Sequence, residues 1–356
     1  MPNVNELGIM YSHTCNIECR HCGINSGPKN RDRMSLELAE RIIDEAALIT
    51  PAIRTIVFTG GEALVHPEDI ETLVERAADL DFETRIVTNG FWGKHPEKGR
   101  RLLSRLRFAG LTSLNFSADK YHLEFQPAST LRSAITIARD MGYPITVSFT
   151  HNGPEDICDV FAELYGMDRE ELVRYDPDST TMLEEFHAQS ASKILVSGGR
   201  LVGMGRAAEY PEEHYLTSLN TFSYGACQEV GQRPVIYPDG TLQACCCAGG
   251  KLSTFAAGNV HREPLAEICA RLPKRTHFRF INTFGPRRLY EVMAEARGLD
   301  VTAPHPSLCD LCVKATTGSA PATVDAILED WAAAQLLSGK VKSGEAAGNP
   351  PGALRG

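Results

Sequence analysis

Three closely spaced cysteines near the N-terminus are the residues best suited to chemistry. They follow the pattern Cys15-x-x-x-Cys19-x-x-Cys22, with no fourth cysteine close by. Zinc sites usually take four protein ligands, commonly as two close pairs. Three thiolates on a four-iron cluster, by contrast, leave one iron open to a chelating substrate. The spacing therefore favours an iron–sulfur cluster over zinc.

A second group of cysteines lies further along the chain, where seven of the eleven fall between Cys227 and Cys312. Cys309-x-x-Cys312 suits two ligands of one cluster, and Cys227 with one cysteine of the run 245–247 would complete four. Two full clusters would need seven or eight cysteines. Eight lie outside the first motif, but Cys158 and Cys269 fall in helix-like segments away from the group, so one auxiliary cluster is the better count. A zinc site with four cysteine ligands has the same pattern and remains the alternative.

The run Cys245-Cys246-Cys247 indicates a further role for a thiol. Adjacent residues in an extended segment point to opposite sides, so all three cannot face one cluster. At least one thiol is therefore expected to remain unligated. Such a thiol near a radical is an efficient hydrogen-atom donor, and the alternative role is that of a small buried hydrophobic residue.

Composition limits the protein class. The chain has 356 residues, 43% of them hydrophobic, enough for a large domain and a smaller one. A net charge of −9 gives no electrostatic reason to bind nucleic acid or acidic membranes. The sequence has no apolar run of membrane-spanning length and no signal peptide, so we expect a cytoplasmic protein. Eleven cysteines in that reducing compartment favour metal ligation over disulfides.

Strand-like and helical patterns alternate up to about residue 218. Helical patterns include Leu36–Ile49 and Pro67–Leu80. Strands are predicted at Leu7–Ser12, Arg54–Thr59, Thr84–Thr88, Leu111–Ser117, Ile145–Thr150 and Lys193–Ser197. This alternation implies parallel βαβ units, in an open or partial barrel or in a doubly wound sheet. In either fold the motifs that follow the strands gather at one edge.

Later segments have a different character. Val235–Tyr237 and Thr241–Ala244, joined by Pro238-Asp239-Gly240, predict a β-hairpin leading into Cys245. Thr323–Leu337 predicts one more helix, and the tail after Gly339 is expected to be disordered. The expected domains are 1–218 for the βα units, 219–320 for the auxiliary cluster, and 321–356 for the helix and tail.

The first cysteine triplet after a predicted strand, followed by Thr59-Gly60-Gly61-Glu62 after the next, resembles the radical S-adenosylmethionine (SAM) superfamily. The resemblance implies an α/β fold, a partial (β/α)6 TIM-like barrel with a smaller C-terminal auxiliary iron–sulfur domain. It implies a [4Fe–4S] cluster on the triplet and SAM, with Gly60, Gly61 and Glu62 at its methionine amino group. Reductive cleavage of SAM would then give a 5′-deoxyadenosyl radical that abstracts hydrogen.

Other polar motifs fit the same family less specifically. Asn89, in Thr88-Asn89-Gly90, and Ser117, in Ser117-Ala118-Asp119, are expected to contact cofactor or substrate, although Asn89-Gly90 is also a common tight turn. Gly203-Met204-Gly205-Arg206-Ala207 is similar to a motif that precedes the auxiliary domain in many relatives. Arg206 is expected to hold a carboxylate of SAM or substrate, and a plain glycine-rich linker is the alternative.

The C-terminal cysteines resemble auxiliary-cluster domains of the SPASM or twitch type. Several stretches, spread over most of residues 7–315, are similar to radical SAM epimerases that invert residues in ribosomally made peptides. They are 59–62, 88–93, 117–122, 237–240 with the cysteines that follow, and 309–312. The resemblance assigns Cys227, Cys245, Cys309 and Cys312 to one auxiliary [4Fe–4S] cluster and makes Cys246 the hydrogen donor. Cys247 departs from that pattern and leaves the assignment open by one position.

The expected partners are a precursor peptide and an electron donor such as flavodoxin or ferredoxin. A radical SAM enzyme that crosslinks peptides through thioether or C–C bonds is one alternative, and one that acts on a small metabolite is another. A non-enzymatic electron carrier or zinc scaffold is disfavoured, because it needs neither Gly-Gly-Glu nor six βα units.

Overall fold

The structure is a computed structural model that describes residues 4–49, 53–175, 193–209, 218–222, 224–246 and 252–337. Its strands are β1 (Glu6–Ser12), β2 (Thr55–Gly60), β3 (Glu83–Thr88), β4 (Ser113–Ala118), β5 (Ile145–Thr150), β6 (Leu172–Arg174), β7 (Ile194–Gly199), β8 (Val235–Ile236), β9 (Thr241–Gln243) and β10 (Ala256–Asn259). Its helices are α1 (Leu36–Ala47), α2 (Pro67–Asp79), α3 (Pro96–Phe108), α4 (Ala128–Asp140), α5 (Ile157–Tyr165), α7 (Leu265–Arg271), α8 (Thr276–Arg297), α9 (Leu308–Thr316) and α10 (Pro321–Leu337).

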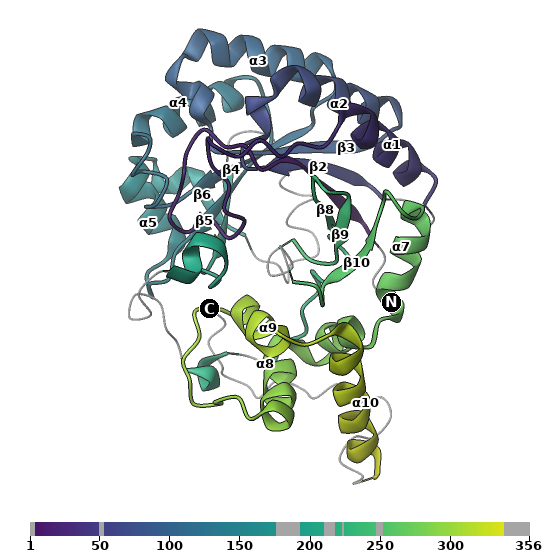
Figure 1. Cartoon of the computed structure of the whole chain (residues 1–356). Coiled ribbons are helices and arrows are strands. Elements are labelled where there is room, and N and C mark those ends of the chain that lie inside the picture. The colour runs from purple at the N-terminus through teal and green to yellow at the C-terminus, as the bar shows by residue number, and fades with distance from the viewer. Residues whose placement is uncertain are drawn as a thin grey trace.

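A single sheet organises the described part of the chain, in the order β10-β9-β8-β1-β2-β3-β4-β5-β7-β6. From β1 to β6 every neighbouring pair is parallel. Helices α2, α3 and α4 lie along the outer side of these strands, as Figure 1 shows. The fold is therefore the expected α/β partial barrel, and the six predicted strands are confirmed.

The end of the barrel holds a strand that the sequence pattern did not reveal. The short strand β6 lies at the edge, and β7 is inserted between β5 and β6. Only three residues form β6, too few for a period-two pattern to be recognised.

The predicted hairpin is confirmed, because β8 and β9 pair antiparallel in the register Val235↔Gln243 and Ile236↔Leu242. The hairpin is also part of the main sheet, since β8 pairs parallel with β1. Gly8 makes this contact possible, because a Cβ there would lie 2.9 Å from Val235 Cγ2. The sheet thus continues past the boundary expected near residue 218, and the division into domains stays a prediction.

Of the helices that follow the hairpin, α8, α9 and α10 lie together on the lower side in Figure 1, whereas α7 lies beside β10 and packs against α1. Helix α10 confirms the predicted helix at 323–337. Helix α8 was not predicted, because it contains a kink at Gly285, whose φ is +81°, followed by Pro286. Gly285 also admits the backbone of Gly225, since a Cβ at 285 would clash with the Gly225 carbonyl oxygen.

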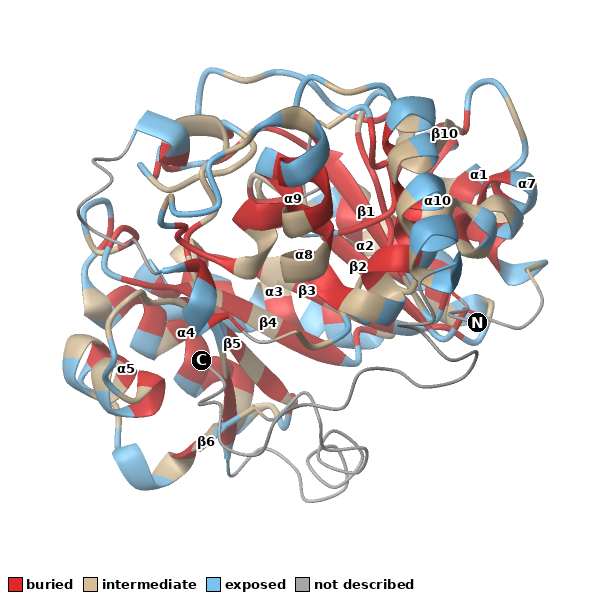
Figure 2. Cartoon of the chain, turned by 90° about the horizontal axis from the view of Figure 1, so that it is seen from below, coloured by how far each residue is buried: buried red, intermediate tan, exposed pale blue. Residues whose placement is uncertain are grey.

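The core lies between the strands and the helices that cover them, where Figure 2 shows continuous burial. Helix α1 illustrates the local rules. Ser35 caps it by accepting a hydrogen bond from Leu38 N, and its apolar stripe, including Ile42 and Ile43, is buried. Within the described ranges, no helix has the length and apolar character needed to cross a membrane. Cys247 lies outside the described residues, and so does the tail after Gly339.

Candidate active site

Residues 13–35, here called the cluster loop, connect β1 to α1 and carry the first three cysteines. Cys15 and Cys19 are buried and Cys22 is half-buried. The loop folds back on itself, because Cys15 N donates to Gly27 O at 3.2 Å and Cys22 N donates to Cys19 O at 3.3 Å. Burial raises the pKa of the Cys15 thiol to about 12.

The cluster loop and the ends of β2, β3 and β4 enclose one cavity of about 290 Å³. Pockets for small-molecule ligands begin at roughly this size. Its lining includes the three cysteines and all six residues expected to bind cofactor or substrate, namely Gly60, Gly61, Glu62, Asn89, Ser117 and Arg206. The fold thus brings together residues that lie nearly 200 positions apart in the sequence. Their individual roles stay predictions.

Gly60 and Gly61 let the end of β2 touch the start of the cluster loop. A Cβ at Gly60 would lie 2.5 Å from Ser12 O, and one at Gly61 would lie 2.4 Å from Thr14 O. The backbones are bonded there, since Gly61 N donates to Ser12 O at 2.7 Å. The glycines are therefore needed for close approach of two backbones, in addition to any contact with SAM.

Glu62 is 1% exposed and anchors the cavity wall. Its carboxylate accepts hydrogen bonds from Leu64 N at 3.0 Å and from Asn89 N at 2.6 Å. Burial, partly offset by these bonds, raises the pKa of Glu62 to about 7. A bound ammonium group would favour the ionised carboxylate.

Asn89 connects β3 to the cluster loop. Its Nδ2 donates to Asn16 Oδ1 at 2.8 Å, and its Oδ1 accepts from Phe91 N at 3.0 Å. Gly90 has a φ of +73°, so the tight turn is real. Asn89 therefore belongs to a tight turn and also lines the cavity. Ser117 lies at the end of β4 on the same wall.

Arg206 reaches across from the segment after β7 and holds the cluster loop. Its Nε donates to Cys19 O at 2.8 Å and its Nη2 donates to Ser26 O at 2.7 Å. Gly205 has a φ of +55°, and a Cβ there would lie 2.5 Å from Cys22 O. The expected carboxylate contact of Arg206 stays a prediction, while these donors already bind loop carbonyls.

A group of three side chains was only partly foreseen. Asp119, after β4, accepts from His122 Nδ1 at 2.8 Å and pairs with His21 Nε2 at 3.0 Å. His21 directly precedes Cys22 in the cluster loop, and all three side chains line the cavity. Asp119 and His122 lie three residues apart within the single stretch 117–122. The tertiary structure adds His21, whose only signal was its place inside the cysteine motif.

The C-terminal cysteines also approach one another. Buried Cys312 lies within electrostatic range of Cys227 and Cys245, and burial raises its pKa well above the usual range. Cys309 lies one turn before Cys312 on α9, so both can face one side of the helix. Two further cysteines, Cys158 and Cys269, pack into the core on α5 and α7.

Cys245 and Cys246 differ in exposure, as expected for adjacent residues of an extended segment. Cys245 is buried, whereas Cys246 is exposed and contacts Glu229 Oε2 at 3.9 Å. Glu229 is in turn held by Arg233 Nη1 at 3.1 Å.

The donor set around the cavity suits a [4Fe–4S] cluster with SAM. Three thiols from one loop face a space bounded by backbone and by the buried carboxylates of Glu62 and Asp119, which leaves a side open for a chelating ligand. Cys15, Cys19 and Cys22 would hold the cluster, and Glu62 would receive the ammonium group of SAM.

Comparison with known proteins gives partial matches to three curated relatives. YydG of Bacillus subtilis (strain 168), a protein assigned to peptide biosynthesis, is 28% identical over 133 residues, which are 37% of this chain and 41% of YydG. The GTP 3′,8-cyclase of Desulforamulus reducens is 34% identical over 124 residues, 33% of this chain and 35% of the cyclase. AlbA of Bacillus subtilis, an antilisterial bacteriocin subtilosin biosynthesis protein, is 36% identical over 79 residues, 22% of this chain and 17% of AlbA.

The chain thus matches less than half the length of each of these relatives. Among solved structures, native anSMEcpe with bound AdoMet is 13% identical and aligns over 94% of this chain and 98% of its own, with a TM-score of 0.49.

The family match covers all of the described cavity lining except Arg206. Residues 9–163 match the Radical SAM superfamily, and this stretch contains the cluster loop, the Gly-Gly-Glu turn and strands β2 to β5. Residues 9–163 therefore form a radical SAM domain.

Proposed function

We propose that this radical SAM enzyme converts L-residues to D-residues in a ribosomally synthesised peptide, with Cys246 as the hydrogen-atom donor. The observation that carries the proposal is the contrast between two neighbouring thiols. Cys245 is buried near Cys227 and Cys312, whereas Cys246 is exposed on the other side of the segment. A thiol that binds the auxiliary cluster and a thiol that donates hydrogen to the substrate must point to different sides of the segment.

Tyr237 relates Cys246 to the cluster loop. This tyrosine is buried after β8, and both Cys22 and Cys246 lie within its electrostatic range. Its ring also lies 6.0 Å from the ring of His13, at the start of the cluster loop. This proximity supports a site in which a bound peptide has the cavity on one side and the Cys246 thiol on the other.

Glu229 supports the thiol role of Cys246. Its carboxylate lies 3.9 Å from the sulfur and is oriented by Arg233. A carboxylate so close accepts the S–H hydrogen bond and so orients the thiol hydrogen. A thiol, and not a thiolate, carries the hydrogen atom that the proposed reaction transfers.

The proposed reaction balances as follows. When bound, the cluster and SAM supply a 5′-deoxyadenosyl radical that takes the Hα of the substrate residue. The Cys246 S–H bond then breaks as a new Cα–H bond forms on the opposite face, which leaves a thiyl radical on Cys246. One electron and one proton restore that thiol, so each turnover uses two electrons from an external donor of the flavodoxin or ferredoxin class.

The relatives support a peptide substrate. YydG is named for peptide biosynthesis and AlbA for bacteriocin biosynthesis, whereas the GTP 3′,8-cyclases make a small-molecule substrate the second candidate. We favour the peptide substrate, because epimerisation needs a hydrogen-atom donor and the exposed Cys246 thiol beside Glu229 can serve as that donor.

Replacing Cys246 with Ala is expected to abolish D-residue formation while SAM cleavage continues. The matched control is Cys158→Ala, which removes a core thiol on α5 and should leave both reactions intact. The measurement combines 5′-deoxyadenosine yield with chiral amino-acid analysis of candidate peptides after anaerobic reaction in D₂O. The wild-type product should gain about 1 Da per inverted residue, because a thiol hydrogen exchanges with solvent.

Unchanged epimerisation by Cys246→Ala would exclude Cys246 as the donor. A loss of about 2 Da from the wild-type product would instead indicate crosslinking or desaturation, with an iron–sulfur cluster as electron acceptor. Turnover of a nucleotide with no change in any peptide would favour the small-metabolite reaction.

We also propose that Cys227, Cys245, Cys309 and Cys312 bind one auxiliary [4Fe–4S] cluster. The wild-type protein should then contain about eight irons per chain, and Cys312→Ala should contain about four. Cys269→Ala, a buried thiol on α7, is the matched control and should keep the full content. Iron and zinc analysis of the reconstituted proteins tests this, since about four irons plus one zinc in the wild type would identify a zinc site instead.

A further inference from the structure

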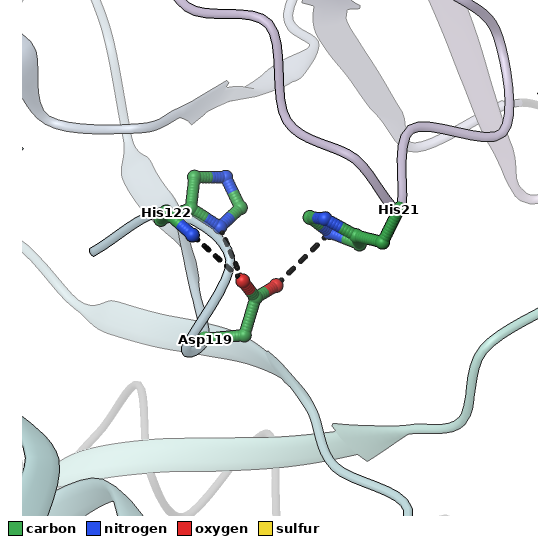
Figure 3. A group of neighbouring side chains, drawn as sticks. All are labelled: His21, Asp119 and His122. Carbon is green, nitrogen blue, oxygen red and sulfur yellow. Dashed lines mark hydrogen bonds and ion pairs between the residues drawn. The ribbon is translucent and has the colours of Figure 1, made fainter. Parts of the chain in front are cut away.

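The group of His21, Asp119 and His122 joins the end of β4 to the cluster loop. One carboxylate holds both imidazoles, with Oδ1 accepting from His122 Nδ1 at 2.8 Å and Oδ2 pairing with His21 Nε2 at 3.0 Å. Figure 3 shows the two rings on either side of the Asp119 carboxylate. A side chain shared in this way fixes the orientation of both histidines.

Asp119 itself is held from several directions. Its Oδ1 also accepts from the backbone N–H groups of Tyr121 at 2.9 Å and His122 at 3.0 Å. Its own backbone is fixed by the Tyr165 hydroxyl, which accepts from Asp119 N at 3.1 Å and donates to Asp119 O at 2.9 Å. The carboxylate is buried, so it is a rigid acceptor screened from solvent.

Both histidines lie next to cysteines of the cluster loop. His122 and Cys19 line the same cavity, and because Asp119 binds Nδ1 of His122, the Nε2 of that ring is left for another partner. His21 directly precedes Cys22, and its ring stacks on Tyr121 with the ring centroids 4.7 Å apart. The group therefore lines the same cavity as the cysteines of the cluster loop.

We propose that Asp119 orients His122 to donate a hydrogen bond to the Cys19 sulfur and thereby raises the reduction potential of the SAM-binding cluster. In this arrangement Asp119 and His21 are positioning residues, because they act through His122 and through the loop around Cys22. His122 acts on a ligand sulfur and not on the substrate.

The physical reason is the charge on the ligand sulfur. Reduction adds an electron to the cluster, and part of that charge lies on the thiolates. A donor pointed at a ligand sulfur stabilises the reduced form more than the oxidised form, which raises the potential. Because the donor is buried, water does not replace it when it is removed.

The inference concerns the radical SAM domain alone. It does not depend on the peptide substrate, on Cys246 or on the auxiliary cluster, so epimerisation and this effect can fail independently.

The test is a redox titration of the anaerobically reconstituted enzyme, with the reduced SAM-binding cluster followed by electron paramagnetic resonance. His122→Leu removes the donor, and at a fixed potential its reduced-to-oxidised ratio should fall about tenfold, a shift of 59 mV for a one-electron couple. His122→Gln retains an N–H donor and should recover most of this shift. His261→Leu changes an exposed histidine after β10 and should titrate like the wild type.

Iron and sulfide content shows whether each variant holds its cluster. A fully loaded His122→Leu enzyme with the wild-type potential would overturn the proposal. If His122→Leu fails to load, Asp119→Asn provides the same comparison, since it weakens the orientation of His122 without removing it. An unchanged potential in a loaded Asp119→Asn enzyme, with His122→Gln also unchanged, would likewise overturn the proposal.

Discussion

Replacing Gly61 with alanine is expected to lower the rate of SAM cleavage about a hundredfold or more. The new Cβ would lie 2.4 Å from Thr14 O and 2.8 Å from His13 O, both rigid backbone atoms. The end of β2 and the cluster loop must therefore separate, which moves Cys15 relative to Glu62. Displacements of about 1 Å between reacting groups commonly cost on the order of a hundredfold in rate.

The matched control for this variant is Gly199→Ala at the end of β7, where an added Cβ meets nothing within 4 Å. The measurements are 5′-deoxyadenosine formation, SAM binding and iron content of the two reconstituted variants. Gly199→Ala should behave like the wild type. Wild-type cleavage by Gly61→Ala would show that the β2 turn and the cluster loop do not need their close contact.

Replacing Glu62 with glutamine is expected to weaken SAM binding roughly tenfold to a hundredfold. The substitution removes a hydrogen bond between a carboxylate and the SAM ammonium group, and bonds of this charged kind contribute about 1.5–3 kcal/mol. It also places an amide NH₂ group next to a backbone N–H that donates to the wild-type carboxylate, that of Leu64 or Asn89, so that two donors face each other. The affinity is measured by isothermal titration calorimetry with anaerobically reconstituted protein.

The pH dependence of SAM binding separates these two effects. Burial raises the pKa of Glu62 to about 7, so without SAM the carboxyl group is protonated below that pH. Because the ammonium group binds the ionised form, wild-type affinity should fall by up to about tenfold per pH unit below pH 7 and level off above it. Glu62→Gln should show no such slope, whereas Glu97→Gln, on the exposed start of α3, should retain it. A wild-type affinity that does not change between pH 5.5 and 7.5 would contradict the assigned role.

Much of the barrel follows from local sequence. Strands β1 to β5 and β7 are apolar, β-branched runs separated by amphipathic helices, and each signal lies within a few residues. The strand-end rule then predicts that Cys15, Glu62, Asn89 and Ser117 meet, because parallel strands end at one edge. The hairpin of β8 and β9 follows from its Asp-Gly turn in the same local way.

Other features depend on contacts between distant segments. The pairing of β8 with β1 follows from the space over Gly8, and helix α8 is kinked at Gly285, where the backbone of Gly225 packs. Neither glycine carries a sequence signal for its partner, since a missing side chain gives no indication of what fills its place.

The sequence by itself determined the ligand chemistry and its order along the chain: the cysteine triplet, the Gly-Gly-Glu turn and the strands that bring them to one edge. Only the tertiary structure decided what surrounds the cluster loop. It places Arg206 on the carbonyls of Cys19 and Ser26, and Asp119 between His21 and His122. The physical reason is that the spacing of residues along the chain determines which side chains lie near one another within one loop. Hydrogen bonds between segments nearly 200 residues apart depend on how the sheet curves and packs.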